Sequence, residues 1–516
     1  MRDPEASFTE RRKLLLGPPG CGKTHRMIWE VEQELARGTR PDEIAMVSFT
    51  RKSVEEARSR ACARFNLTPK DLPWFQTLHA MGLRLLGIAP SQIMAQADWK
   101  DFGRSLGIDI KGVDDRSARD GLIIAQTVGG DKYVSILERS IMRCIPLEQE
   151  FSETNDWNLS WPMLKKVEQE LMFYKSTYNK FSFVDMINEV VVQELQGPRL
   201  KLLVVDEAQD LTPLQWRMVE LLAERSDRVL FAGDDDQAIH RWAGVKVKLF
   251  MESSRNIEVL SQSYRLPRPV YETCVGISSR IRDRLPKEFY PAPHDGSVSR
   301  VMGPRNLDLR EGKWMVLART NSYVQEWAQR LRQDGYMFKV YGRNSVDPKL
   351  ADAIKGWRTL QTGGALPVGA IKALYEMLPK QGDAAALKRG STKLLEAFNP
   401  EGLYDYDHLV ASAGMIAGRG MDALQVLNLG SFDADYIRGL ERRGEDISGE
   451  PRIKLSTGHA AKGGEEDNVA VDLSSTKACV NTQFPDDEHR TMYVCGSRAK
   501  KNLVFVHTDK EYRYVL

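Results

Sequence analysis

Apolar and polar positions follow two different periods over the first part of the chain. The apolar run at residues 14–16 predicts a buried strand, and over residues 24–37 apolar side chains recur at helical spacing. Residues 43–50 predict a second strand, and residues 51–64 predict a second helix with one apolar face. Strands that alternate with helices in this way are typical of a parallel sheet whose faces are covered by helices.

The same alternation continues along the chain with two long interruptions. Residues 91–180 and 349–449 lose the strand pattern and predict helices, so we interpret both as insertions. Further strands are predicted at residues 201–205, 228–232, 315–321, 452–455, 469–473 and 502–506, and a helix is predicted around residues 490–500. Residues 74–79 predict a short strand or turn, and residues 259–267 predict a strand that enters a helix. The expected fold class is therefore α/β, with two parallel-sheet domains that each carry a mainly helical insertion.

Domain boundaries follow from where the alternation stops and restarts. We expect the first domain at residues 1–90 and 181–256, its insertion at 91–180, the second domain at 257–348 and 450–516, and its insertion at 349–449.

A glycine-rich turn lies between the first predicted strand and the first predicted helix. It fits the phosphate-loop pattern G-x-x-x-x-G-K-[ST] and consists of Gly17, Pro18, Pro19, Gly20, Cys21, Gly22, Lys23 and Thr24. In such a loop backbone N–H groups surround a phosphate chain, the lysine reaches the β- and γ-phosphates, and the threonine hydroxyl holds Mg²⁺. Because strand, turn and helix come in the required order, we expect a nucleoside triphosphate site, with a backbone role for Cys21.

Acidic and amide side chains follow two other predicted strands. Asp206 and Glu207 come directly after the run at residues 201–205, where an aspartate would orient Mg²⁺ and a glutamate would polarise the attacking water. A solvated acidic turn is the alternative interpretation. Gln237 follows the run at 228–232, where its amide could sense a γ-phosphate.

Aromatic rings and a cation follow Gln237 closely. His240, Arg241 and Trp242 form a short group of a kind that can stack unpaired bases. Burial of the Trp242 ring in the core is the competing interpretation.

Composition narrows the function classes. A hydrophobic content of 42% and a charged content of 28% are ordinary for a globular protein, and no apolar run approaches the length of a membrane span. The six cysteines form no CxxC pair, which argues against zinc and a disulfide framework. The charged N-terminus lacks a signal-peptide core, which predicts a cytoplasmic protein. With a net charge of only +2, a nucleic-acid site would have to be a local groove.

The order of the motifs resembles superfamily 1 DNA helicases of the UvrD, Rep and PcrA type. The resemblance rests on residues 17–24, 47–52, 77–80, 206–210, 233–239, 262–265, 457–465 and 493–500. It implies two RecA-like motor domains that hold ATP and Mg²⁺ between them. Lys23, Thr24, Asp206 and Glu207 would come from the first domain, and Arg265 and Arg498 from the second.

Further roles follow from the same resemblance. Tyr264 would stack on the adenine, while Gly463 and Glu465 would approach the ribose or the phosphates. Residues that would face single-stranded DNA are Phe49, Thr50, Arg51, Thr77, His79, His240, Trp242 and His459. Residues 1–16 contain no glutamine, whereas the family usually carries one there to recognise adenine.

The function implied is that of an ATP-dependent DNA helicase that moves 3′→5′ along single-stranded DNA and unwinds duplexes. A translocase that displaces bound proteins with little unwinding and a non-catalytic nucleic-acid-binding scaffold stay open as alternatives. The expected partners are single-stranded DNA and its junctions with duplex, with RNA and with replication or repair proteins as further candidates. We expect a monomer without membrane association. The short insertions fit a compact member of the family, such as one encoded by a phage.

Overall fold

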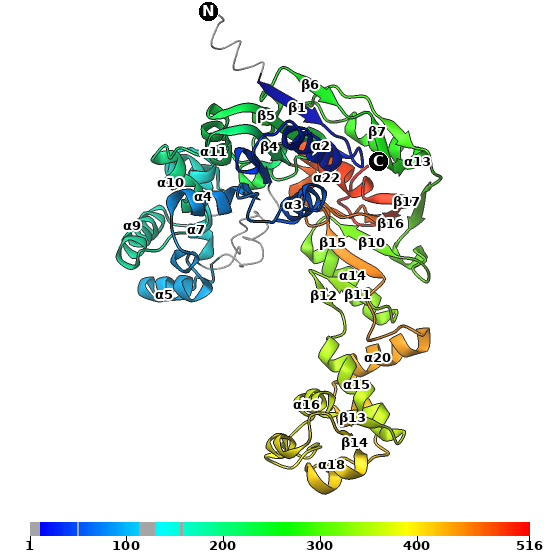
Figure 1. The fold of residues 1–516 in the computed structure, drawn as a ribbon. Coiled ribbons are helices and arrows are strands. Elements are labelled where there is room, and N and C mark those ends of the chain that lie inside the picture. Colours follow the sequence, from blue (N-terminus) through cyan, green and yellow to red (C-terminus); the bar gives the residue numbers. More distant parts are fainter. Residues whose placement is uncertain (1–10, 49–50, 113–129, 155–157) are drawn as a thin grey trace, which may run out of the picture. The chain divides into compact units, whose positions relative to one another are not determined.

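The computed structural model of the protein describes residues 11–48, 51–112, 130–154 and 158–516 (Figure 1). The chain divides into two compact units. Unit 1 comprises Met1–Gly296 and Thr482–Ser497, and unit 2 comprises Ser297–Asn481 and Arg498–Leu516. Each unit is built around one main sheet, so the expected α/β class with two parallel sheets is confirmed.

The main sheet of unit 1 has six parallel strands in the order β3-β2-β4-β5-β1-β6. Their bounds are β1 (Arg12–Leu16), β2 (Ile44–Ser48), β3 (Phe75–Thr77), β4 (Leu200–Asp206), β5 (Ser226–Gly233) and β6 (Ile257–Val259). All residues of β2 are buried, as expected for a strand covered on both faces.

Two helical layers cover this sheet. The side chain of Leu15 packs in one apolar cluster with α2 (Lys23–Ala36) and α3 (Arg51–Phe65), whereas Leu14 and Leu16 belong to a second cluster. That second cluster includes α4 (Leu78–Leu86), α10 (Asp185–Val192) and α11 (Pro213–Glu224). Successive residues of a strand face opposite sides of the sheet, so one apolar run supplies both layers.

The first insertion is helical where the structure describes it. It contains α5 (Gln96–Leu106), α7 (Asp131–Arg143), α8 (Leu147–Glu153) and α9 (Trp161–Tyr178). These helices share a small core of their own around Trp99, Phe102, Leu137 and Leu164. Figure 1 shows α5, α7 and α9 grouped together.

The segment that follows β5 belongs by its contacts to unit 1. After α12 (Val247–Met251), β6 pairs with β1, and β7 (Gln262–Pro267) pairs with β8 (Tyr290–Ala292) in a separate small sheet. The segment 259–267, predicted as a strand that enters a helix, contains the last residue of β6 and the whole of β7, because the chain leaves the main sheet between these two strands. Helices α13 (Arg268–Ser278) and α22 (Pro485–Gly496) also lie in this unit, whereas the sequence had suggested that the second domain begins at residue 257.

The main sheet of unit 2 has seven strands in the order β12-β11-β15-β10-β16-β17-β9. The bounds are β9 (Ser297–Met302), β10 (Trp314–Ala318), β11 (Phe338–Val340), β12 (Arg343–Asn344), β15 (Ile453–Thr457), β16 (Glu466–Asp472) and β17 (Ala499–His507). Only the β11–β12 pair is antiparallel among the pairs described. α14 (Asn321–Gln333) and α20 (Ser431–Arg443) pack on the sheet core.

The second insertion combines helices with one small hairpin. Its elements are α15 (Pro348–Gln361), β13 (Ala365–Pro367), α16 (Val368–Met377), α17 (Ser391–Leu394), β14 (Leu403–Asp405), α18 (Tyr406–Ser412) and α19 (Ala423–Val426). β13 and β14 pair antiparallel. Trp357 and Tyr375 are fully buried in one apolar cluster with residues of the main sheet.

The predicted helix over residues 490–500 differs from the structure at both ends. α22 starts at Pro485, which suits the first helical turn, and ends at Gly496, while β17 already begins at Ala499. A short α21 (Lys477–Val480) precedes it. Within the described residues, every helix is too short or too polar to cross a membrane.

Candidate nucleotide-binding site

Three loops meet at the carboxyl edge of the unit 1 sheet. β5 lies between β1 and β4, and Leu16 at the end of β1 pairs with Gly233 at the end of β5. The next residue, Gly17, donates its backbone N–H to the carbonyl of Gly233 over 2.9 Å. The phosphate loop after β1, the acids after β4 and the loop after β5 therefore share one edge, where ligands bind in open α/β sheets.

The backbone of the phosphate loop requires its glycines. Gly20 and Gly22 have φ angles of 74° and 75°, in the left-handed region that side chains disfavour. A Cβ on Gly17 would lie 2.0 Å from Cγ of Lys23. The Lys23 ammonium donates to the carbonyl of Gly17 over 2.6 Å, so the lysine is held across the loop at the start of α2. A helix N-terminus with a cation above it is a ready anion site.

The cysteine of this loop has a structural role. Cys21 is buried, and burial raises the pKa of its thiol to about 12, against the opposing effect of Lys23. A thiol with such a pKa stays protonated at neutral pH and is a poor nucleophile. The expectation of a backbone role at this position fits that environment.

A segment far along the sequence rests on the phosphate loop. The Ser263 hydroxyl donates to the carbonyl of Pro19 over 2.8 Å, and the N–H of Tyr264 donates to the carbonyl of Gly20 over 2.9 Å. A Cβ on Gly20 would lie 2.3 Å from Cβ of Arg265. β7 thus brings Arg265 against the loop, within unit 1, and leaves the Tyr264 ring 70% exposed beside it.

Asp206 is a buried carboxylate with few partners. It accepts a hydrogen bond from the Ser48 hydroxyl at 3.4 Å and one from the N–H of Glu207 at 2.9 Å. Burial raises its pKa to about 7, the charge of Glu207 adds to this, and the charge of Lys23 opposes it. A cation near this carboxylate would favour its ionised form, which is the situation that a Mg²⁺ ion creates.

Glu207 has an unusual backbone conformation. Its φ angle is 49°, in the left-handed region that few residues other than glycine adopt. Non-glycine residues held there cluster at functional sites, where the surrounding structure enforces the conformation. With this conformation, Glu207 does not continue the extended backbone of β4.

A side-chain relay, which the sequence analysis did not identify, links Glu207 to Gln237. The Gln209 amide donates to the Glu207 carboxylate over 2.5 Å and accepts from the N–H of Asp234 over 3.1 Å. Asp234 in turn accepts from the Gln237 amide over 2.7 Å. The sequence feature that could have predicted this relay is the glutamine two residues after Glu207, close to the end of β4.

A buried lysine anchors the loop after β5. The side chain of Lys287 is fully buried, and its ammonium lies 3.2 Å from Asp234 and 3.1 Å from Asp236 and also bonds Asp235. Arg284 forms two bonds with Asp236, one of them 2.9 Å long, and Arg490 of α22 donates to the carbonyl of Asp235 over 3.0 Å. Three consecutive aspartates after a buried strand are the sequence feature that could have predicted buried cations at this place.

The charges of this cluster shift its pKa values. Burial acts to raise the pKa of Asp234, but Lys287 and Lys23 together hold it below the usual value. Burial also disfavours a charged Lys287, yet the three aspartates raise its pKa above the usual range. Asp236 differs, because burial raises its pKa in spite of Lys287 and Arg284. The attraction between Lys287 and Asp234 fixes the segment that carries Gln237.

The residues expected to face DNA differ in exposure. Trp242 is 45% exposed, whereas His240 is buried, and Thr77 caps α4 by accepting from the N–H of Ala80. His79 is buried, and burial lowers its pKa to about 4. Phe49 and Thr50 lie outside the described residues, Arg51 opens α3, and His459 lies half-buried in unit 2.

Unit 2 holds the remaining predicted residues of the nucleotide site. Arg498 is buried and donates to the carbonyl of Gly464 over 3.2 Å. Gly463 has a φ angle of 77°, and the exposed Glu465 lies 3.9 Å from Lys500. These contacts order the turn between β15 and β16, and the nucleotide roles of Arg498, Gly463 and Glu465 stay predictions.

Comparison with known proteins gives a consistent picture. Residues 3–258 match the UvrD/REP helicase N-terminal domain. A putative ATP-dependent DNA helicase YjcD of Bacillus subtilis is 21% identical, over 96% of this chain and 76% of that protein. The ATP-dependent DNA helicase PcrA of the same organism is 23% identical over 56% of this chain and 40% of its own length.

Other relatives match over a smaller share of their length. The ATP-dependent DNA helicase Rep of Buchnera aphidicola subsp. Baizongia pistaciae is 22% identical over 65% of this chain and 52% of its own length. The chain thus spans about half the length or less of the PcrA and Rep relatives and about three quarters of YjcD. From the phosphate loop, the acids after β4 and these matches, residues 3–258 of the chain are a UvrD/REP helicase N-terminal domain.

Proposed function

We propose that this protein is an ATP-dependent DNA helicase that moves along single-stranded DNA in the 3′→5′ direction. The observation that carries the proposal is the continuous set of contacts from the phosphate loop to Gln237 in unit 1. Lys23 crosses the loop and Gly17 bonds the end of β5. Asp206 ends β4 on the other side of β5, and Gln209 links Glu207, the next residue, to the loop after β5. Relatives of this chain are named ATP-dependent DNA helicases, one of them as putative.

The residues of unit 1 suit the chemistry of phosphoryl transfer to water. Lys23 and the N–H groups of the phosphate loop would bind the β- and γ-phosphates, because all of them are donors at the start of α2. Glu207 would orient the attacking water and accept its proton. Arg265, held against Gly20, would neutralise charge that develops on the phosphoryl group.

Thr24 and Asp206 are the residues that would hold Mg²⁺. A hydroxyl in the first turn of α2 and a carboxylate at the end of β4 are hard oxygen ligands, and Mg²⁺ in such sites binds one or two carboxylates together with substrate phosphates. When bound, the ion would neutralise phosphate charge. The raised pKa of Asp206 fits a carboxylate that needs a nearby cation to stay ionised.

Gln237 would couple nucleotide state to DNA. Its amide is fixed by Asp234 at one end of the relay, and the exposed Trp242 lies five residues further along the same segment. An exposed aromatic ring can stack on an unpaired base, a contact that contributes about 1–3 kcal/mol per base. A shift of Gln237 between nucleotide states would thereby reach the DNA contact.

ATP hydrolysis in the presence and absence of oligothymidylate tests the proposal first. We expect stimulation by single-stranded DNA, and we expect Lys23→Ala to abolish turnover while DNA still binds. Strand displacement with 3′-tailed and 5′-tailed duplexes then tests direction. Stepping on single strands with negligible duplex separation would instead identify a translocase, and the absence of DNA-stimulated hydrolysis would overturn the proposal.

A further inference from the structure

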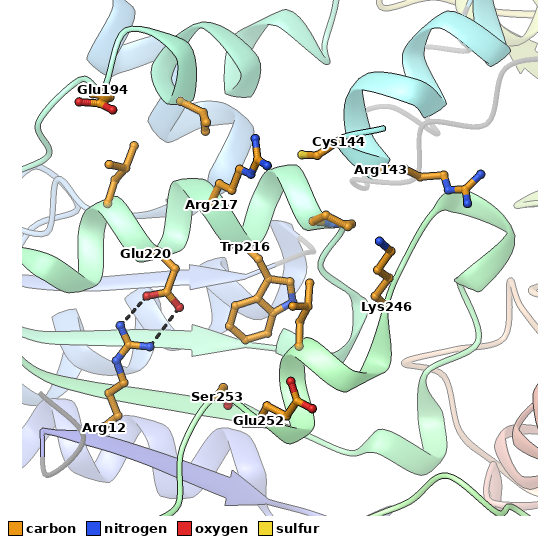
Figure 2. Close-up of a pocket in the computed structure, with 14 residues that line it drawn as sticks. Arg12, Arg143, Cys144, Glu194, Trp216, Arg217, Glu220, Lys246, Glu252 and Ser253 are labelled. Atoms are coloured by element: carbon orange, nitrogen blue, oxygen red, sulfur yellow. Dashed lines mark hydrogen bonds and ion pairs between the residues drawn. The ribbon is translucent and has the colours of Figure 1, made fainter. Parts of the chain in front are cut away.

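A second cavity in unit 1 lies away from the phosphate loop. It has a volume of about 770 Å³ and is lined by residues from the end of α7, from α10, from α11 and from the α12 region (Figure 2). This volume falls within the range of pockets that bind ligands. None of the residues that carry the proposed hydrolysis lines it.

One end of this cavity is basic. Arg217 and Lys246 are exposed, and within the described part of the chain the side chain of neither forms a hydrogen bond or an ion pair. Both cations lower the pKa of the Cys144 thiol, against the larger opposing effect of burial, so both lie near Cys144. Arg143, which pairs with Glu150 and Glu153, completes this end.

The middle of the cavity offers a buried donor on an apolar floor. Trp216 is 5% exposed, and its indole Nε1–H has no hydrogen-bond partner among the described residues. Pro213, Leu221 and Leu249 line the cavity around it. A buried N–H without an acceptor costs about 1–3 kcal/mol, so a ligand that brings a carbonyl to this point gains that energy.

Acidic side chains also line the cavity. Glu194 and Glu252 are exposed and have no ion-pair partner among the described residues, and Glu220 pairs with Arg12. In Figure 2 the cations Arg143, Arg217 and Lys246 lie to the right of the Glu194 and Glu220 side chains, with the Trp216 ring between Glu220 and Lys246 in the view. The charge of the cavity is thus divided.

We propose that this cavity binds a peptide segment of a partner protein that carries one acidic side chain, with its carboxylate between Arg217 and Lys246 and a backbone carbonyl at Trp216. Apolar side chains of the segment would cover the floor. A peptide fits because it carries one anionic group, neutral acceptors and apolar side chains within a short length. A nucleic acid fits less well, because its successive phosphates would meet the three glutamates.

Phage display of random peptides on the whole protein tests this proposal. Phage clones that bind a variant with both Arg217→Glu and Lys246→Glu are removed first, because such clones do not need the basic end of the cavity. Both positions are exposed, so charge reversal there should leave the fold intact. A matched control carries Lys248→Glu and Arg255→Glu, which are exposed cations outside the cavity. Thermal melting of both proteins checks that they are folded.

We expect enriched peptides that contain acidic and apolar residues. As labelled synthetic peptides they should bind the parent and the control alike, bind the Arg217→Glu, Lys246→Glu protein at least ~10-fold more weakly, and lose about fivefold in affinity with Trp216→Phe. Lys23→Ala should leave peptide binding unchanged, which separates this site from ATP hydrolysis. The proposal is overturned if no peptide is enriched, if the charge reversal has no effect, or if oligothymidylate displaces the peptides.

Discussion

Two strands of the molecule end in the same pattern and use the terminal carboxylate differently. β4 in unit 1 ends with Val204, Val205 and Asp206, and β16 in unit 2 ends with Ala470, Val471 and Asp472. Both aspartates are buried at the carboxyl end of a parallel strand. By local sequence alone each could be a magnesium ligand.

Asp206 and Asp472 differ in the groups that surround their carboxylates. Asp472 accepts from the indole of Trp327 at 2.7 Å and from the N–H of Ser474 at 2.8 Å, so both carboxylate oxygens are used within the core. Asp206 instead lies beside Glu207, and burial together with that like charge raises its pKa. A carboxylate that is well bonded to neutral donors stabilises the fold, whereas one placed against another acid calls for a cation.

The largest expected effect comes from Glu207→Gln. An amide cannot accept a proton from water, so we expect the rate of DNA-stimulated ATP hydrolysis to fall by about 10²–10⁴-fold, with ATP binding retained. Phosphate release under saturating ATP measures the rate. Hydrolysis at the parental rate would show that Glu207 is not the base.

Lys287→Met should have the next largest effect. It leaves three buried aspartates without their shared cation, and breaking a buried ion pair in this way costs about 3–5 kcal/mol of unfolding free energy. Denaturant unfolding measures the loss, and Lys287→Arg, which keeps the charge, should recover part of it. Equal stability of the Lys287→Met protein and the parent would contradict the anchoring role.

The substitution Asp472→Ala tests whether Asp472 has a structural role and no role in hydrolysis. The change leaves the Trp327 indole and the Ser474 N–H without acceptors, so we expect a loss of about 1–3 kcal/mol in stability. ATP turnover at low temperature, where the protein is folded, should match the parent. A loss of turnover as severe as that of Glu207→Gln would place Asp472 in the chemistry instead.

The substitution Glu138→Gln tests whether a raised pKa by itself identifies a carboxyl group that takes part in function. Glu138 of α7 is buried in unit 1, and burial raises its pKa from 4.5 to about 7, while Lys175 opposes the shift. Between those values the folded state binds the proton more tightly than the unfolded state, so stability falls as the pH rises.

The glutamine variant lacks that titration. We therefore expect it to gain stability over the parent by about 1–2 kcal/mol near pH 8 and by much less near pH 5, since one pKa unit corresponds to about 1.4 kcal/mol. Thermal melting at the two pH values measures the difference, with turnover unchanged. A gain that is equal at both pH values would show that the carboxyl group does not titrate in this range.

Local patterns predicted much of this protein. Consecutive apolar residues predicted the core strands, because a strand buried on both faces needs such a run. The phosphate loop was predictable because its backbone angles require glycines at Gly20 and Gly22. The order of these motifs along the chain also sufficed to suggest the family.

Only the tertiary structure decided which distant groups meet. Lys287 lies about fifty residues after the aspartates that it contacts, β7 returns to the phosphate loop from outside the main sheet, and Trp327 identifies Asp472 as structural. Sequence periodicity reports which residues are buried, whereas pairing of buried charges depends on long-range packing that no local pattern encodes. For the same reason the sequence did not predict that cations and glutamates line the second cavity together, since Arg217, Lys246 and Glu194 come from separate segments.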